Sequence, residues 1–403
     1  MTLPSSGPIN FSDVNIELGN SSTSTLVIPS SKVRTLTGVS SGPIVMPTDF
    51  YNKSYLAFNT PSTVPPNSFS VYLNSVAVNS SGLHVAISGN GALYYSTSTD
   101  GNIWSTLTQI PSGTFAVSGA AIAVNAAGLF VIIGYRDFGG NTGVPVYLTS
   151  TNGTTWSSIT QFTGLSNCKL NGLTVDSSGR FVAVGTGPNQ EFVTAYADSL
   201  NTTTLSSWTV TIGSNAIGSR FNARSVCVNS STGQFVAVGY NAYNYPTTSI
   251  STGGATWAAP ATMNGSTTIA IMTGVAVNSS GLYVAVGYNY ANGTGSGYPV
   301  YSTSTNGTTW TTPAVINGTT TFAYMMGIAV NSSGLFVAVG YNVSGGYPVY
   351  TISGNGSTWS TPATMGLSAT ATNIVAVTAN PSGKFVAVGY YSSNGFAAYA
   401  TSQ

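Results

Sequence analysis

Charged side chains are scarce in this chain. They make up 4% of its 403 residues, the net charge is +1, and no Asp or Glu occurs between Ser199 and the C-terminus. The sequence has no basic stripe, so nucleic acid is not an expected partner, and it has no polybasic or amphipathic helix that would favour a membrane surface. Because no apolar run reaches the roughly 18 residues of a membrane span, we expect no membrane insertion.

Cysteine and histidine are nearly absent as well. Two cysteines provide no disulfide framework, and one histidine adds too few ligands for a zinc site. The sequence contains no G-x-x-x-x-G-K-[ST], so its 47 glycines are expected in turns and close packing rather than around a phosphate. We therefore predict neither a metal site nor a cofactor. The first residues, MTLPSSGPINFSD, lack the charged leader and the apolar core of a secretory signal, which predicts synthesis in a cytosol.

What the chain does contain is a repeat, typified by IAVNSSGLFVAVGY at Ile328–Tyr341. Seven copies centre on Gly82, Gly128, Gly179, Gly233, Gly281, Gly334 and Gly383. Successive glycines are 46 to 54 residues apart, which is close to the period of propeller blades and too long for a solenoid coil.

Each copy has the pattern of a β-hairpin. Ile328–Asn331 and Leu335–Tyr341 are short apolar runs rich in β-branched and aromatic residues, as strands are. Asn331 can bond the backbone two residues further on, and Gly334 can take the positive φ of a bulged turn. The second run is apolar on both of its faces, so it must be buried between two neighbouring sheets. Radially packed blades meet that requirement.

We therefore predict an all-β fold, a seven-bladed propeller of four-stranded blades over residues 55–403. In the sixth copy the strands are expected at 327–331, 335–342 and 347–353, with the fourth starting near Trp359. The seventh copy stops after its third strand. Residues Tyr55–Asn59 (YLAFN) are predicted to pair with the C-terminal strand and so close the ring, because closure removes the last open edge.

Residues 1–54 do not share the repeat and form a separate arm. Their sequence resembles a short N-terminal module of many phage tail and other virion proteins, through the segments LPSSGPINFSDVNIELG and VRTLTGVSSGPIVMPTDFYNKS. The matching residues are Leu3, Pro4, Ser6, Gly7, Ile9, Phe11, Ser12, Asp13, Glu17, Gly19, Arg34, Leu36, Gly38, Asp49, Phe50, Tyr51, Lys53 and Ser54. Asn52 and Thr48 depart from the pattern. The resemblance implies location in a virion, within an oligomeric assembly whose other structural proteins bind residues 1–54.

Six of the repeats contain one tryptophan each, and in five of them it ends a short glycine-containing turn motif such as STDGNIW or STNGTTW. These turns resemble the Asp-box of sialidase-like propellers, with Ser98, Asp100 and Trp104 nearest to it. They are one residue shorter, and other residues replace the Asp in four copies, namely Asn152, Gly253, Asn306 and Asn355. The third blade departs further and reaches Trp208 through LNTTTLSSW. In that family the box is a folding element, so the resemblance supports a propeller fold but does not indicate an activity.

Residues for catalysis are few. A glycosidase usually needs two carboxylates flanking one bond, and the candidates all lie in the first half: Asp137, Glu191 and Asp198. A sialidase-type site would also need clustered arginines, but these fall at unrelated blade positions: Arg136, Arg180, Arg220 and Arg224. Arg180 occupies a turn position beside the hairpin glycine. His84 fills a slot that is Phe or Tyr in the other copies, which indicates a core residue. We predict no catalytic residues.

The remaining signal lies in the loops between the second and third strands. They vary in length and are rich in Tyr, Asn and Gly, a composition typical of surfaces that bind varied partners. The candidate binding residues are Tyr243, Tyr245, Tyr290, Tyr298, Tyr347 and Tyr391. The alternative is that several of them pack between blades, above all Tyr298 and Tyr347, which share the sequence GYPVY.

The function that the sequence favours is that of a non-enzymatic virion structural protein, a tail-fibre or adhesin-type component whose propeller binds a host surface glycan or receptor. An uncharged surface rich in Tyr and Asn suits neutral glycans. Two alternatives stay open. The propeller could be a purely structural decoration or bracing subunit of the tail or capsid, or a degenerate sialidase-like glycoside hydrolase.

Overall fold

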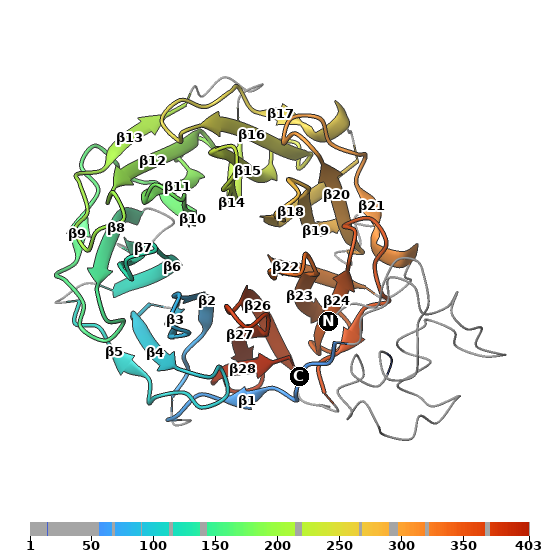
Figure 1. Cartoon of the computed structure of the whole chain (residues 1–403), viewed down its shortest axis with the longest axis horizontal. Coiled ribbons are helices and arrows are strands. Elements are labelled where there is room, and N and C mark those ends of the chain that lie inside the picture. Colours follow the sequence, from blue (N-terminus) through green and yellow to red (C-terminus); the bar gives the residue numbers. More distant parts are fainter. Residues whose placement is uncertain are drawn as a thin grey trace.

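A computed structural model describes Val14 and residues 56–402, apart from 67–68, 90, 113–115, 138–142, 214–219, 266–267, 290–296, 319–321 and 367–370. The described strands form seven four-stranded antiparallel sheets arranged as a ring around a central axis (Figure 1). This confirms the predicted seven-bladed propeller. The arm of residues 1–54 lies outside the described residues except for Val14, so its boundaries and its resemblance stay predictions.

In every blade but the last, four consecutive strands run from the axis to the rim. The innermost strands are β2 (Leu73–Val78), β6 (Ala116–Val124), β10 (Lys169–Val175), β14 (Asn222–Asn229), β18 (Ala270–Val277), β22 (Ala323–Val330) and β26 (Thr372–Ala379). The second strands are β3 (His84–Ser88), β7 (Phe130–Asp137), β11 (Arg180–Thr186), β15 (Gln234–Tyr240), β19 (Tyr283–Asn289), β23 (Phe336–Asn342) and β27 (Phe385–Tyr391).

The third strands are β4 (Tyr94–Ser98), β8 (Gly143–Ser150), β12 (Phe192–Asp198), β16 (Pro246–Thr252), β20 (Pro299–Ser304), β24 (Pro348–Ser353) and β28 (Ala397–Thr401). The outer strands are β5 (Thr108–Gln109), β9 (Thr160–Gln161), β13 (Thr209–Ile212), β17 (Ala261–Thr262), β21 (Ala314–Val315), β25 (Ala363–Thr364) and β1 (Ser62–Thr63). Two single 3-10 turns follow β17 and β21, η3 (Met263–Gly265) and η4 (Ile316–Gly318).

The hairpin turn of the repeat forms as its residues predict. The Asn331 Oδ1 accepts hydrogen bonds from the backbone amides of Ser333 (3.1 Å) and Leu335 (3.0 Å). Gly334 has a φ of +83° and donates its amide to the Asn331 carbonyl at 3.0 Å. These bonds fix the register of β22 on β23, so the apolar second strand is presented to both neighbouring blades.

The innermost strands contain a β-bulge that the sequence pattern did not predict. In the sixth blade the register shifts between Met325 and Gly327, so β22 starts at Ala323 rather than at Gly327. Gly340 of β23 lies opposite Met325, and a Cβ there would overlap the Tyr324 carbonyl oxygen. The glycine in VAVGY is therefore required by the close approach of the bulged strand.

The outer strands are shorter and start later than predicted, with β25 beginning at Ala363 rather than near Trp359. At Ser360 the amide still donates to the Ile352 carbonyl at 2.9 Å, but the Ile352 amide donates back to the Ser360 hydroxyl at 3.1 Å. The Ser360 carbonyl accepts from the Thr351 hydroxyl at 2.6 Å. Side-chain hydroxyls thus replace regular ladder bonds next to the tryptophan, and only two residues complete the strand.

The core consists of the layers between adjacent blades. Second strands are buried on both faces, as predicted: all five residues of β3 are buried, as are the first five of β19, β23 and β27 and the second to sixth of β11 and β15. In one layer Val284 and Val286 of β19 pack with Phe336 and Ala338 of β23. Burial of such apolar surface is the main contribution to the stability of the fold.

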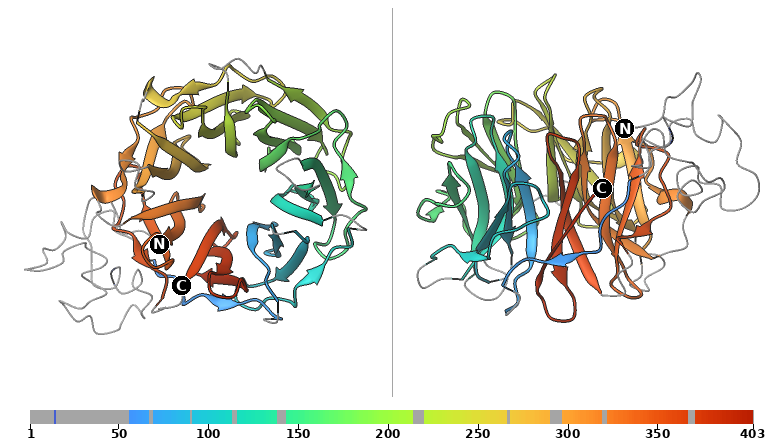
Figure 2. Two further views of the ribbon diagram at one scale, coloured as in Figure 1. Left: turned by 180° about the vertical axis from the view of Figure 1, so that it is seen from behind. Right: turned by 60° about the horizontal axis from the view of Figure 1, so that its bottom comes forward.

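The ring closes between the two ends of the chain, as predicted. Phe58 bridges Ser402, and the amide of Asn59 donates to the Thr401 carbonyl at 2.9 Å. The regular pairing of β1 with β28 lies a few residues further on, at Ser62 and Thr63 (Figure 2). The displacement has a packing cause, since Phe58 is buried against the Tyr350 ring, with centroids 5.1 Å apart. Tyr55 lies outside the described residues.

Candidate functional site

Because strands alternate in direction, each face of the disc collects one class of connection. The turn face carries the NSSG turns and the turns before the tryptophans. The loop face carries the links between blades and the loops between second and third strands, of which the structure describes 187–191, 241–245, 343–347 and 392–396 in full.

The tryptophan turns of the turn face are structural clasps. The Asp100 Oδ1 accepts from the amides of Asn102 and Ile103, both at 2.8 Å, and the Trp104 Nε1 donates to the Gly101 carbonyl at 2.9 Å. Asn152 accepts from the equivalent amides at 3.0 and 2.8 Å. Asn thus supplies the same acceptor oxygen as Asp, and its Nδ2 can also donate, as Asn152 does to the Thr155 hydroxyl at 3.4 Å. The Ile103 amide, with the other donors, lowers the pKa of Asp100.

These turns also hold adjacent blades together. Gly356 has a φ of +74°, and a Cβ there would lie 2.7 Å from the Val284 Cγ2 of the preceding blade. Four other blades repeat the arrangement, with turn glycines against a second-strand valine: Gly101 on Val386, Gly153 on Val85, Gly254 on Val182 and Gly307 on Val236.

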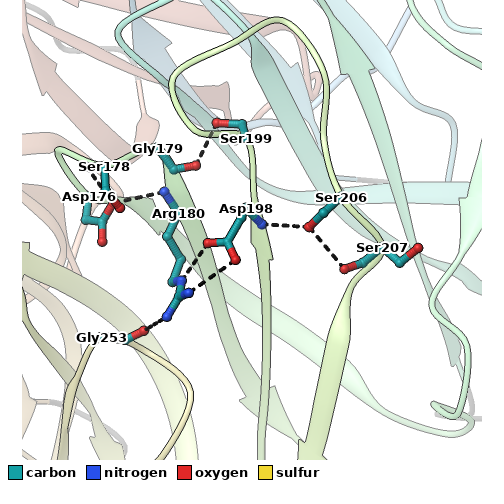
Figure 3. Close-up of polar contacts among 9 residues, drawn as sticks. All are labelled: Asp176, Ser178, Gly179, Arg180, Asp198, Ser199, Ser206, Ser207 and Gly253. Carbon is teal, nitrogen blue, oxygen red and sulfur yellow. Dashed lines mark hydrogen bonds and ion pairs between the residues drawn. The ribbon is translucent and has the colours of Figure 1, made fainter.

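Between the third and fourth blades charged side chains add to this clasp. Arg180 forms an ion pair with Asp198, with Nε to Oδ1 at 2.6 Å and Nη2 to Oδ2 at 3.1 Å. Its Nη1 donates to the Gly253 carbonyl of the fourth blade at 2.5 Å, so the guanidinium bridges two blades (Figure 3). The hydrogen bonds that Arg180 donates to the Asp198 carboxylate raise the pKa of Arg180. Arg180 directly follows the turn glycine, where a turn position was predicted, but it is the first residue of β11.

The described carboxylates are not arranged as a glycosidase pair. Glu191 directly precedes β12 and Asp198 ends it, so they lie at opposite faces of the disc, with backbones about 23 Å apart at about 3.3 Å per residue. Glu191 accepts from the amide and the side-chain Nδ2 of Asn189, both at 2.8 Å. Arg180 and Arg220 also lie on opposite faces, so they cannot surround one substrate carboxylate. Nothing is described of the Asp137 side chain.

His84 is a core residue in the structure. It is fully buried, its Nδ1 lies 3.3 Å from the Ser98 carbonyl, and its ring packs edge-on to Trp104. Desolvation by burial lowers its pKa. Both cysteines are buried and free, and burial raises the pKa of the Cys227 thiol. Among the described residues no three His, Cys, Asp or Glu side chains gather as metal ligands, and no helix could span a bilayer.

The structure separates the six candidate tyrosines into different environments. Tyr243 is 58% exposed and Tyr347 36% exposed. Tyr298 is half-buried with its ring 4.9 Å from that of Phe322, and Tyr391 donates its hydroxyl to the Pro61 carbonyl at 2.6 Å in the closing blade. Tyr298 packs as the alternative expected and Tyr391 is packed as well, whereas Tyr347, which the alternative also named, is exposed. Tyr290 lies outside the described residues.

Two of the six meet in one loop. Asn241 and Tyr245 close it through a bond from the Asn241 amide to the Tyr245 carbonyl at 3.0 Å, and the Tyr243 and Tyr245 rings lie 5.9 Å apart. The Asn241 Oδ1 accepts from the Tyr243 and Tyr245 amides at 2.9 and 3.1 Å. The Ala270 amide donates to the Asn244 carbonyl at 2.9 Å, which places the 43% exposed Ile269 beside this loop. We call Tyr243, Tyr245 and Ile269 the aromatic patch.

A cavity of about 410 Å³ adjoins this loop in the fourth blade. It is lined by Arg220 from the link before β14, Asn241, Thr247 of β16, Thr262 of β17 and Gly265 of η3. Sequence reasoning missed it, because its lining residues come from four separate segments. The one signal was Arg220, a rare charge among mostly uncharged blades.

Neither a protein-family model nor a curated protein sequence matches this chain. Solved structures are similar to it. A protein of unknown function from Dyadobacter fermentans has a TM-score of 0.56 at 13% identity, covering 86% of this chain and 99% of its own. The likeness establishes the fold alone.

Two further structures agree on that fold. The WD40 β-propeller domain of Doa1 has a TM-score of 0.56 at 14% identity, covering 87% of this chain and 97% of its own. An α-L-arabinanase from Penicillium chrysogenum in complex with arabinobiose has a TM-score of 0.51 at 11% identity, covering 86% and 98%. The names include a hydrolase and a WD40 domain, so they do not single out one function.

Proposed function

We propose that this chain is a non-enzymatic virion structural protein of the tail-fibre or adhesin type. Residues 1–54 attach it to other virion proteins, and the propeller presents its loop face to a glycan or receptor on the host surface. The attachment rests on the resemblance of the arm. The observation that carries the binding role is the aromatic patch, where Tyr243 is 58% exposed although most aromatic side chains of the blades are packed.

The patch has the physical properties of a carbohydrate-binding surface. Sugars present hydroxyls and apolar ring faces, and a tyrosine supplies a rigid apolar plane together with a hydroxyl. The loop under Tyr243 is held by two bonds to the Asn241 Oδ1 and one from Ala270 to Asn244. A loop fixed before binding loses less conformational entropy when the ligand arrives.

The placement of the carboxylates supports a non-enzymatic role. Retaining and inverting glycosidases separate their two carboxyl groups by roughly 5 to 9.5 Å. Glu191 and Asp198 lie at opposite ends of β12, and Asp198 is held by Arg180. Neither carboxylate is free to act with the other on one bond.

Glycan-array screening of the full chain tests the proposal. We expect binding of at least one glycan class and loss of most of that signal in Tyr243→Ser. Ile103→Ser is the matched control, because Ile103 is 77% exposed on the turn face. No binder above background, or equal losses in the two variants, would contradict binding through the aromatic patch.

A bracing subunit is the second candidate. One observation favours it: the turn face also exposes large apolar side chains, Ile103 at 77% and Leu200 at 76%. A propeller clamped between neighbouring subunits would cover both faces, and low charge would lower the cost of burying them. In that case Ile103→Ser and Leu200→Ser should reduce particle assembly and leave glycan binding unchanged.

A further inference from the structure

The cavity beside the aromatic patch is rich in hydrogen-bond donors. Arg220 contributes a guanidinium whose Nε is buried and has no hydrogen-bond partner within the described residues. The Asn241 Oδ1 is already occupied by two loop amides, which leaves its Nδ2 as the group able to bond a ligand. Thr262 adds a hydroxyl.

The described residues that line this cavity include no carboxylate to neutralise the arginine. Glu191 is a described acid that feels the charge of Arg220: burial raises its pKa, but hydrogen bonds from Asn189 and, to a smaller extent, the charge of Arg220 lower it overall. Its two oxygens accept from the Asn189 amide and the Asn189 Nδ2, and it forms no ion pair with Arg220 among the described contacts. Within the described residues no hydrogen bond or ion pair occupies the Arg220 guanidinium, which lines the cavity.

We infer that this cavity binds the carboxylate of an acidic sugar, with Arg220 and Asn241 as donors and the sugar ring directed toward Tyr243. An Arg donor paired with a carboxylate is a strong, charge-assisted arrangement, and the planar fork can bond both oxygens. The volume of about 410 Å³ lies within the range of small-molecule sites and accommodates one monosaccharide unit. The inference rests on the proposed glycan binding and names its charged subsite.

The test is a titration of the full chain with sodium glucuronate, followed by isothermal calorimetry or ligand-observed NMR. Glucose and methyl glucuronate are titrated in parallel as uncharged probes. We expect glucuronate to bind at least about tenfold more tightly than either, and its affinity to fall as salt is raised. Arg220→Gln should lower the glucuronate affinity by at least about tenfold.

Arg224→Gln is the matched control. Arg224 is an exposed arginine of the same blade, but it lies over the Tyr240 ring and donates to the Tyr240 hydroxyl at 3.0 Å, away from the cavity lining. Its loss should leave glucuronate binding unchanged. Arg220→Lys keeps the charge without the planar fork and should retain partial affinity. If Arg220→Gln unfolds at a lower temperature than the parent chain, the Arg220→Lys variant tests the role of Arg220 in its place.

The outcomes separate this inference from the proposed function. Unchanged glucuronate affinity in both Arg220 variants, or equal affinity for glucose and glucuronate, overturns the acidic-sugar subsite even if neutral glycans bind on the array. Arg220-dependent glucuronate binding with an unchanged array signal in Tyr243→Ser supports the subsite and contradicts the aromatic patch. Failure of every saccharide to bind contradicts both.

Discussion

Gly356→Ala is predicted to destabilise the propeller because the turn glycine touches the preceding blade. A non-glycine residue at a φ of +74° costs about 1–2 kcal/mol. The added Cβ would also lie 2.7 Å from the Val284 Cγ2 and 3.0 Å from the Leu282 Cδ2, and such overpacking costs about 1–3 kcal/mol. The expected loss in the free energy of unfolding is therefore about 2–5 kcal/mol.

Gly334→Ala provides the matched control. Gly334 has a φ of +83°, but no atom lies within 4 Å of the position of an added Cβ. Its substitution should cost only the backbone term of about 1–2 kcal/mol. Urea unfolding followed by tryptophan fluorescence measures both variants, and the difference of about 1–3 kcal/mol is the contact between blades.

A double variant isolates that contact further. Val284→Ala removes the methyl groups that an alanine at 356 would meet, so the two substitutions together should cost less than the sum of their separate effects. Equal losses for Gly356→Ala and Gly334→Ala, or strict additivity with Val284→Ala, would refute the claim that these turns clasp adjacent blades.

Three further predictions concern acid sensitivity, the tryptophan turns and ring closure. The melting temperature should fall less steeply between about pH 7 and pH 5 in His84→Phe than in the parent chain. The folded pKa of His84 lies below its unfolded value of 6.5, so the unfolded chain binds more protons below that pH and acid destabilises the fold. An unchanged slope would contradict this. Asp100→Asn should change stability at pH 7 by less than about 1 kcal/mol, since three other turns use Asn as the acceptor, whereas Asp100→Ala should cost more. Phe58→Ala should lower the free energy of unfolding by about 3–5 kcal/mol and speed proteolysis of the segment around Phe58 and β1 that closes the ring. An unaltered digestion rate would argue against closure by this segment.

Repetition made the architecture predictable. Seven copies of one hairpin, each with a strand that is apolar on both faces, require radial packing whatever the details of any one copy. Ring closure followed from the missing strand at the C-terminus. The exact pairing did not, because it depends on how Phe58 packs against Tyr350, a contact between residues 292 positions apart.

Local geometry was predicted less well. The bulges of the innermost strands have no turn residue to mark them, and their clearest sign is the glycine of the facing strand, such as Gly340 opposite Met325. The outer strands were placed too early because Trp359 suggests a strand, whereas its side chain belongs to the turn and bonds the Gly356 carbonyl at 3.1 Å.

The candidate site divides in the same way. Composition identified the tyrosine-rich loops, but it could not separate the exposed Tyr243 from Tyr391, which is held by Pro61 in the closing blade. The cavity of Arg220 was not predicted, because Arg220 was its one signal in the sequence. It exists only where a link, a loop and an outer strand meet in the fourth blade.

The most direct test of the proposed role is a cryo-EM map of the intact particle that carries this chain. The account predicts that residues 1–54 are buried against neighbouring virion proteins while the loop face, with the aromatic patch and the Arg220 cavity, is open to solvent. A propeller covered on both faces by other subunits would contradict host binding and identify the chain as a bracing component.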